Sequence, residues 1–341
     1  MEITRRQFVK ITALTTSGIV IGTPKTLLSS WNQKEKSVKN EDPKIRVVGI
    51  GGAGCCAVKH MIRTGLKQAE FIVADTDPGD LEFNSCRLKI LIDVNPFKRG
   101  VCKGDPETVY LATLNSKEAI RRYLRGSDLV LIVAGLGGHT GTIGAPVVAQ
   151  ISKALGAWTV AVVTTPFPFE RKWRSIVAEK GLRQLDQAAD VTVLIPGENI
   201  VGVLSPSSTL KHAFRKPGWI LSCVVQAFSN TRFHCVAFED VKKVFSGVGR
   251  GYVGIGKDRG NGLIGAVHEA INSPLLRGVA LKEARGIICN MSLSGKETIG
   301  EIREACKMFE KEVHEDADVL VNYEDIGKGK GKVTLIAMGF A

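Results

Sequence analysis

The stretch AGLGGHTGTIGAP, Ala134–Pro146, lies between an apolar run and a segment with helical periodicity. A Gly/Thr-rich loop in that place gathers backbone N–H groups and hydroxyls at a helix N-terminus, where an anion binds well. A tight turn that requires small residues is the alternative interpretation. We take six consecutive residues as candidate nucleotide contacts: Gly137, Gly138, His139, Thr140, Gly141 and Thr142.

A second glycine loop lies nearer the N-terminus, in RVVGIGGAGCCAV, Arg46–Val58. Its Gly49-x-Gly51-x-x-Gly54 spacing follows a β-branched run, and Asp75 comes about 20 residues later, as in a dinucleotide fingerprint. A dinucleotide site gives no reason for the Gly/Thr-rich loop at Ala134–Pro146, whereas a site that holds several phosphates from two sides does. We therefore expect a nucleoside triphosphate and no NAD, with contacts from Gly51, Gly52, Ala53, Gly54, Cys55 and Cys56.

The segments around both loops predict an α/β fold. Apolar strands such as DLVLIVAGL and WTVAVVTTP alternate with helical stretches, which indicates a Rossmann-like parallel sheet covered on both faces. We expect helices near Cys55–Thr64, Lys117–Leu124, Ala145–Leu155 and Arg171–Gln187, and a long central helix that follows Pro217 and continues to about Thr231.

Beyond the central helix, the pattern predicts a smaller α+β domain with a mixed sheet. Helices are expected near Leu263–Ile271 and Glu297–Val313, and the strands DVLVNY and KVTLIAMGF indicate a hairpin-like ending. The expected organisation is a signal or anchor at 1–22, a polar linker at 23–44, a nucleotide-binding domain with the central helix at 45–232, and the smaller domain at 233–341.

The composition excludes a disordered or fibrous chain, because 44% of the 341 residues are hydrophobic. The net charge of +12 favours anionic partners, but aromatic residues make up only 6%, so we expect no nucleic-acid surface built on base stacking. None of the eight cysteines forms a CxxC pair, and we predict no metal site. Three cysteines in apolar segments are expected in the core: Cys223, Cys289 and Cys306. Three others lie near the expected ligand, where a redox or metal role is the alternative: Cys55, Cys56 and Cys102.

The N-terminal segment differs in character from the rest of the chain. TRRQFVK, Thr4–Lys10, precedes a mild apolar run, Ile11–Gly22, in the manner of a twin-arginine export signal. The run is too short and too polar for a spanning helix, which needs about 20 apolar residues. We expect export to a periplasmic or membrane-associated location, with a membrane tether if the segment is retained. A basic surface arm on a cytoplasmic protein is the alternative.

From Lys44 to Ala341 the chain resembles FtsZ, the bacterial branch of the tubulin/FtsZ GTPase family. Both glycine loops, PFPFERKWR, FEDVKKVF and SPLL…ARGIICN occur in that family's order and spacing. The resemblance implies a GTP-binding and GTP-hydrolysing protein, with Mg²⁺ beside the nucleotide, that polymerises head to tail. It also implies that Glu170 and Arg174 contact the ribose and a phosphate, and that Phe214 packs on the base.

Departures from the family occur where its chemistry is expected. Cys56 stands at the family's Asn position, and His139 replaces a glycine, where its ring could donate to a phosphate or could narrow the pocket. The family's guanine-reading Asp falls on Trp219, and an indole cannot accept the two donors of guanine. We therefore expect weakened guanine selectivity, because a site that leaves polar groups of its ligand unpaired discriminates against that ligand.

The hydrolytic loop also departs from the family. CVAFED supplies Cys235, Ala237 and Asp240 where the family has an Asn and two acids, so only Asp240 remains as a catalytic residue to orient water. We expect slow or absent GTP hydrolysis, and no tail peptide for adaptor proteins after Ala341. Two hypotheses stay open: a GTP-binding polymer former, and a non-hydrolysing structural relative in the cell envelope.

Overall fold

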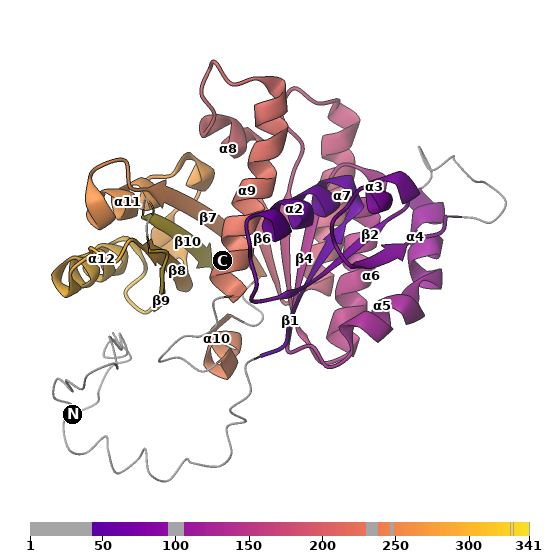
Figure 1. Cartoon of the computed structure of the whole chain (residues 1–341), viewed down its shortest axis with the longest axis horizontal. Helices are drawn as coiled ribbons and strands as arrows, with labels where there is room; N and C mark the ends of the chain where they lie inside the picture. Colours follow the sequence, from indigo (N-terminus) through magenta and orange to yellow (C-terminus); the bar gives the residue numbers. More distant parts are fainter. Residues whose placement is uncertain are drawn as a thin grey trace, which may run out of the picture.

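The computed structural model describes residues 43–94, 106–229, 238–245, 249–327, 329 and 331–340. Within these residues, ten strands form one sheet with the order β3-β2-β1-β4-β5-β6-β7-β10-β8-β9. Figure 1 shows the N-terminal domain, in indigo to magenta, and the smaller C-terminal domain, in orange to yellow, on either side of helix α9, Leu210–Ser229. The predicted α/β fold with a central helix and a second, smaller domain is confirmed.

Six parallel strands form the N-terminal part of the sheet. They are β1 Ile45–Ile50, β2 Glu70–Asp75, β3 Leu88–Leu91, β4 Leu129–Gly135, β5 Trp158–Thr164 and β6 Val191–Ile195. Every residue of β5 and β6 is buried, as expected for parallel strands that are covered on both faces. Because the six strands run in one direction, their carboxyl ends share one edge of the sheet.

Helices cover both faces of this sheet. One face carries α2 Gly51–Arg63, α3 Pro78–Glu82, α9 and the short α8 Gly197–Gly202. The other carries α4 Pro106–Asn115, α5 Lys117–Leu124, α6 His139–Ala154 and α7 Lys172–Ala188. Two apolar cores result: Met61, Val224 and Phe228 belong to the first, and Ile120, Val148 and Leu185 to the second.

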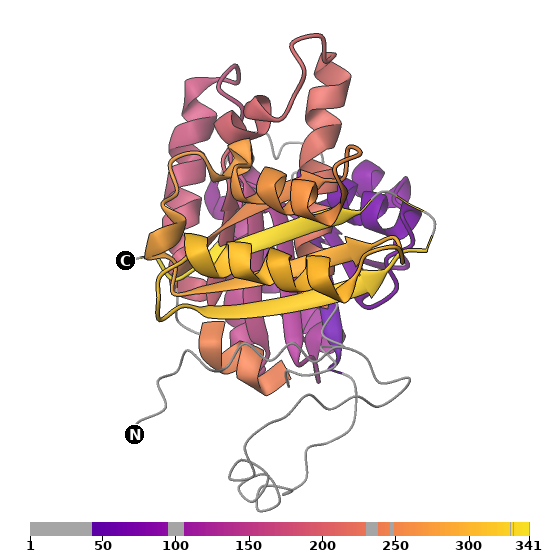
Figure 2. The same cartoon turned by 90° about the vertical axis from the view of Figure 1, so that its left-hand side faces the viewer.

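The C-terminal domain continues the sheet. Its elements are α10 Phe238–Phe245, β7 Gly249–Lys257, α11 Gly262–Ile271, the 3₁₀ turns η2 Pro274–Leu276 and η3 Leu281–Glu283, β8 Gly286–Leu293, α12 Ile299–Glu312, β9 Asp318–Asp325 and β10 Lys332–Met338. Figure 2 shows α11 and α12 in front of these strands. A short parallel pairing of β6 with β7, Val191–Val193 against Gly249–Gly251, joins the two domains.

The mixed sheet of this domain is confirmed, but the predicted hairpin-like ending is wrong. β10 inserts between β7 and β8 and pairs antiparallel with both, while β9 lies beyond β8 and pairs with it in parallel. The connection from β8 to β9 contains α12, and a helical crossover returns the chain parallel to the strand it left. The last two strands therefore follow each other in sequence without being neighbours.

Three helices begin earlier than the sequence predicted. α2 begins at Gly51 rather than Cys55, and α6 at His139 rather than Ala145, so the glycine loops form the first turns of these helices. α9 begins at Leu210 and contains Pro217, which was expected to precede it. Glycine and proline disfavour helices in isolated segments, and here tertiary packing overrides that preference. None of the described helices is both long and apolar enough to cross a membrane. The N-terminal segment 1–42 and the predicted boundary near Phe233 lie outside the described residues.

Candidate nucleotide site

The N-termini of α2 and α6 meet at the carboxyl edge of the parallel sheet, because the strands that lead into them, β1 and β4, are neighbours. A Cβ placed on Gly51 would lie 2.9 Å from the amide nitrogen of Gly141 and 3.4 Å from Cβ of Thr140. Each helix N-terminus has N–H groups without an intrahelical partner and carries partial positive charge. The two ends therefore direct donors toward one space, which we call the cradle.

Neither helix end is closed by a side chain. The N-cap residues, Ile50 for α2 and Gly138 for α6, make no side-chain capping hydrogen bond, and neither first turn contains an acid. Asp77 and Thr298 accept capping bonds at the starts of α3 and α12, whereas α5, α7, α8 and α11 also begin without a side-chain cap. Uncapped ends leave their N–H groups available to an anionic ligand, so the cradle fits phosphate groups.

The glycines of the cradle are required by close approach of backbones. Gly51 has a φ of +71° and Gly137 a φ of +99°, which L side chains rarely adopt. A Cβ on Gly54 would overlap the carbonyl oxygen of Val133, and one on Gly141 would lie 2.5 Å from that of Gly135. Gly138 differs, because no heavy atom lies within 4 Å of a Cβ built there. This open space lies at the N-cap of α6, where a ligand would enter.

The hydroxyls of the two predicted threonines each take part in a hydrogen bond near the cradle. Thr142 Oγ1 accepts a hydrogen bond of 2.7 Å from the backbone N–H of Gly137, and its residue is buried. Thr140 Oγ1 lies 2.8 Å from Thr76 Oγ1, which connects α6 to the residue after β2. Thr76 was not predicted as a site residue. Its position directly after a parallel strand, at the carboxyl edge, is the signal that could have identified it.

Aromatic and charged side chains border the cradle at the start of α7. The imidazole of His139 stacks on the indole of Trp173, with 5.8 Å between ring centroids and 19° between planes. Glu170 Oε1 accepts from the N–H of Phe167 at 2.9 Å, and its Oε2 lies 2.8 Å from Arg174 Nε. The structure thus brings Glu170, Arg174 and His139 to one side, around Trp173, which the sequence analysis missed although PFPFERKWR contains it.

Phe214, predicted to pack on the base, belongs to an aromatic cluster between α9 and the β5–α7 loop. Its ring meets Phe167 edge-on at 5.4 Å and Phe169 at 6.2 Å, while Phe167 and Phe169 stack at 5.0 Å. Phe214 is 52% exposed and Phe169 is 56% exposed. The cluster leaves an apolar surface open to a planar ligand.

Trp219, at the position of the family's guanine-reading Asp, is covered by two ammonium groups. Lys216 Nζ lies 4.5 Å and Lys257 Nζ 4.2 Å from the centroid of its ring. Burial lowers the pKa of Lys216, and the charge of Lys257 adds to that effect. Cation–π contacts stabilise this arrangement, but neither an indole nor an ammonium can accept a hydrogen bond from guanine.

The two cysteines of the Arg46–Val58 loop differ in their surroundings. Cys55 is buried, and its Sγ lies 3.7 Å from Asp75 Oδ2; burial and then this carboxylate raise the pKa of its thiol well above the ordinary value. Cys56 is exposed, and its thiol pKa is raised by partial burial and by Asp80. The described residues contain no cluster of three or more His, Cys, Asp or Glu side chains placed to hold a metal. Cys102 lies outside them.

Asp75, the acid of the dinucleotide spacing, has a structural role. Its residue is only 3% exposed, and Oδ1 accepts from the backbone N–H groups of Thr76 at 2.7 Å and Asp77 at 3.3 Å. These bonds fix the turn between β2 and α3. The Asp75 carboxylate therefore bonds to the backbone of the turn that follows it, which argues against the ribose contact that a dinucleotide site would need.

The predicted catalytic residue, Asp240, lies in α10. The placement of its side chain, and of Cys235 and Ala237, lies outside what the structure describes. The expectation of weak hydrolysis therefore stays a prediction.

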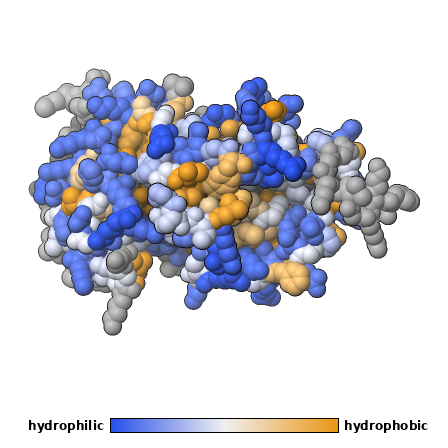
Figure 3. Space-filling view, turned by 90° about the horizontal axis from the view of Figure 1, so that it is seen from above, coloured by the Kyte–Doolittle hydropathy of each residue, from blue (hydrophilic) through white to orange (hydrophobic). Residues whose placement is uncertain are grey.

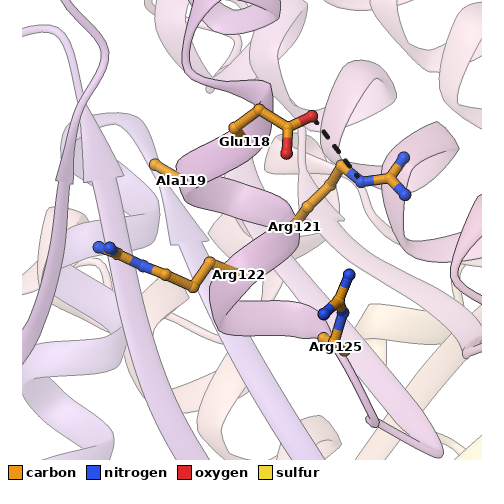
Figure 4. Close-up of a pocket in the computed structure, with 5 residues that line it drawn as sticks. All are labelled: Glu118, Ala119, Arg121, Arg122 and Arg125. Atoms are coloured by element: carbon orange, nitrogen blue, oxygen red, sulfur yellow. Dashed lines mark ion pairs between the residues drawn. The ribbon is translucent and has the colours of Figure 1, made fainter.

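A recess of about 480 Å³ along α5 is lined by Glu118, Ala119, Arg121, Arg122 and Arg125. Figure 4 shows Arg122 on one side of α5 and Arg121 and Arg125 on the other, all pointing away from the helix, with Glu118 Oε1 4.0 Å from Arg121 Nε. α5 ends at Leu124, just before β4 begins, so this recess lies at the edge opposite the cradle. It is separate from the nucleotide site.

Comparison with known proteins agrees with this geometry. Residues 44–205 match the family model described as the tubulin/FtsZ family GTPase domain, and residues 249–341 match the FtsZ family C-terminal domain. The cell division protein FtsZ of Rickettsia conorii is 37% identical over 306 residues, which cover 87% of this chain and 68% of the relative. FtsZ of Rickettsia felis is likewise 37% identical.

Solved structures give the same result. An empty FtsZ dimer from M. jannaschii has a TM-score of 0.81 and 33% identity, covering 92% of this chain and 91% of the other. CetZ2 from Haloferax volcanii, solved as a GTPγS-bound protofilament, has a TM-score of 0.71 at 16% identity and shares the fold. A match to a GTPase domain implies GTP binding, which the cradle suits. The chain belongs to the tubulin/FtsZ family.

Proposed function

We propose that this chain is an FtsZ-like protein that binds GTP in the cradle and assembles head to tail into filaments. The observation that carries the proposal is the contact between two uncapped helix N-termini, where a Cβ on Gly51 would lie 2.9 Å from the nitrogen of Gly141. Donors from two helices suit a chain of linked phosphates better than a single anion. Mg²⁺ would bind with the nucleotide, since this ion keeps phosphate and water ligands.

Guanine selectivity is proposed to be weak. At the position where the family presents a carboxylate, Trp219 lies between the ammonium groups of Lys216 and Lys257. The N1–H and amino donors of guanine would meet no acceptor from this residue, which removes the usual reason to prefer GTP over ATP. The aromatic cluster around Phe214 contacts either purine through its ring face and adds no selectivity.

Hydrolysis is proposed to be slow or absent. The sequence around α10 retains Asp240 but has Cys235 and Ala237 where the family has further polar groups. With one carboxylate to orient the attacking water, we expect turnover well below that of ordinary family members. A turnover rate comparable to theirs would refute this part of the proposal.

Self-assembly is supported by an apolar surface near the cradle. Six large apolar side chains on α7, α8, α9 and the β5–α7 loop are 41–62% exposed: Phe169, Trp173, Ile176, Val201, Leu210 and Phe214. Figure 3, which looks onto this end of the molecule, shows apolar surface gathered near its middle and surrounded by polar residues. Exposed apolar patches with polar rims are typical of protein–protein contacts, and a second copy of the chain is the partner we propose.

The cellular role has two candidates. Relatives named cell division protein FtsZ, at 37% identity, support a role in division. The twin-arginine-type segment at Arg5 and Arg6, together with Trp219, supports the alternative of an exported, non-hydrolysing structural protein of the envelope, tethered through its N-terminus. A reporter fused to the first 44 residues tests export: a periplasmic or membrane-bound reporter supports the alternative, and a cytoplasmic one contradicts it.

The central proposal is tested with the full-length chain. Binding of labelled GTP, ATP and NAD is measured in parallel with light scattering. Binding of GTP or ATP with increased scattering supports a nucleotide-dependent polymer, and scattering without any nucleotide supports the structural alternative. Binding of NAD alone would contradict both.

A further inference from the structure

We propose that the imidazole of His139, held by Trp173, is a phosphate ligand of the cradle that makes triphosphate binding depend on a proton. This inference rests on the proposed nucleotide binding and names a contact that a glycine at this position cannot make. Trp173 acts as a positioning residue, because its indole stacks on the imidazole of His139.

His139 lies at the entrance of the cradle. It is the first residue of α6, between Gly138, which faces open space, and Thr140, whose Cβ lies 3.4 Å from a Cβ placed on Gly51. The residue is only partly exposed. Its backbone N–H therefore belongs to the group of free helix donors, and its side chain leaves the helix beside them.

The stack on Trp173 determines where the ring goes. With 5.8 Å between centroids and 19° between planes, the imidazole lies nearly parallel to the indole of Trp173, which belongs to α7. No described residue makes a hydrogen bond to either ring nitrogen. Both nitrogens thus remain available to a ligand.

Several charged groups of the described residues surround the stack of His139 on Trp173. From the start of α7 and the preceding loop, Arg174 and Glu170 face it; they pair with each other at 2.8 Å, and the Arg174 guanidinium lies 5.8 Å from the Trp173 ring. On the α2 and α3 side, Asp75 is bonded to its own backbone, and Asp80 lies 3.1 Å from a Cβ placed on Gly52. Glu170 and Asp75 therefore already have partners within the protein.

The sign of the effect follows from linkage. A phosphate favours the protonated imidazole, which has two N–H donors and a positive charge, over the neutral ring, which has one donor. Binding therefore takes up a proton, and affinity rises as pH falls. Full coupling of one proton changes affinity by at most about tenfold per pH unit.

The test is calorimetric and does not depend on hydrolysis. Inorganic tripolyphosphate is titrated into the full-length chain at pH 7 in two buffers with different ionisation enthalpies, which yields the protons taken up per ligand. The same titration is repeated from pH 6 to pH 8. Four variants are compared: His139→Gly, Trp173→Ala, Trp173→Phe and, as a matched control, His268→Gln on the exposed side of α11.

We expect His139→Gly to remove the part of the proton uptake that exceeds the ligand's own titration, and to bind tripolyphosphate several-fold more weakly at pH 6 than the parent. Trp173→Ala should lose much of this uptake, whereas Trp173→Phe, which can still stack, and the His268→Gln control should retain it. Unchanged proton uptake in His139→Gly, or tighter binding by that variant at all pH values, would overturn the inference while leaving the proposed function intact. A parent chain that binds neither tripolyphosphate nor GTP at any pH refutes the proposed function and this inference with it.

Discussion

Replacement of Gly51 by alanine perturbs the contact on which the cradle depends. Gly51 has a φ of +71°, and the added Cβ would lie 2.9 Å from the backbone nitrogen of Gly141, closer than real Cβ atoms approach other heavy atoms. The left-handed conformation costs an L residue about 1–2 kcal/mol. Moving one helix end away from the other adds about 1–3 kcal/mol, as in other overpacked sites. We expect Gly51→Ala to lose about 2–5 kcal/mol of unfolding free energy.

Gly65 provides a matched control. It follows α2 with a φ of +80°, and no heavy atom lies within 4 Å of a Cβ built on it. Gly65→Ala therefore carries the conformational cost alone, about 1–2 kcal/mol. The difference between the two variants isolates the contact between α2 and α6.

The assay is urea unfolding followed by tryptophan fluorescence, in which the buried Trp158 reports on the N-terminal core. Tripolyphosphate binding to the folded variants is measured in parallel. Gly51→Ala should bind the ligand much more weakly, and Gly65→Ala should bind it like the parent. Equal losses of stability in the two variants, with ligand binding retained in Gly51→Ala, would refute the proposed role of this contact.

Three further predictions concern the surroundings of the site. Gly181→Ala would place a Cβ against Thr142 Cγ2, so we expect about 1–3 kcal/mol of destabilisation in urea and weaker ligand binding. Gly300→Ala in α12, where the Cβ would make only an ordinary contact of 3.7 Å with Thr298 Oγ1, should be close to neutral, and similar losses in both variants would contradict this. Because burial and Asp80 raise the thiol pKa of Cys56, alkylation of Cys56 by iodoacetamide should be slower at pH 7 than that of a free cysteine, and faster in Asp80→Asn. The buried Cys55 should stay unmodified in the native protein. Rapid labelling of Cys56 at pH 7 would contradict this prediction. Burial raises the pKa of Asp75, so the native state holds the Asp75 proton more tightly than the unfolded state does, and stability falls as pH rises from the ordinary pKa of 3.8 to the raised one. Asp75→Asn should remove this part of the pH dependence of the urea midpoint. An unchanged pH dependence in Asp75→Asn would refute this contribution of Asp75.

The parallel sheet and both phosphate loops were predictable from the sequence because their signals are local. Buried parallel strands are mostly apolar, as in β4 and β5, and the two glycine loops each follow such a strand. Where the helices after the two loops begin was harder to predict. Residues Gly51–Gly54 and His139–Ile143 are helical because the two turns pack on each other, and no local propensity indicates that contact.

The rest of the site depends on contacts between distant segments. Trp173 stacks on His139, Thr76 meets Thr140, and Lys257 covers Trp219, although each pair is far apart in sequence. The insertion of β10 between β7 and β8 has the same origin, since pairing order reflects the whole sheet. A single sequence indicates which residues are unusual at these positions, and the structure shows which of them contact each other.

The most direct test of the account is competition for labelled GTP on the full-length chain at equilibrium. The account predicts saturable GTP binding that tripolyphosphate and ATP displace and that an excess of NAD does not, because the phosphate cradle, and not the base, supplies the affinity. Gly51→Ala should greatly weaken this binding. Absence of GTP binding, or binding that NAD displaces and tripolyphosphate does not, would contradict it.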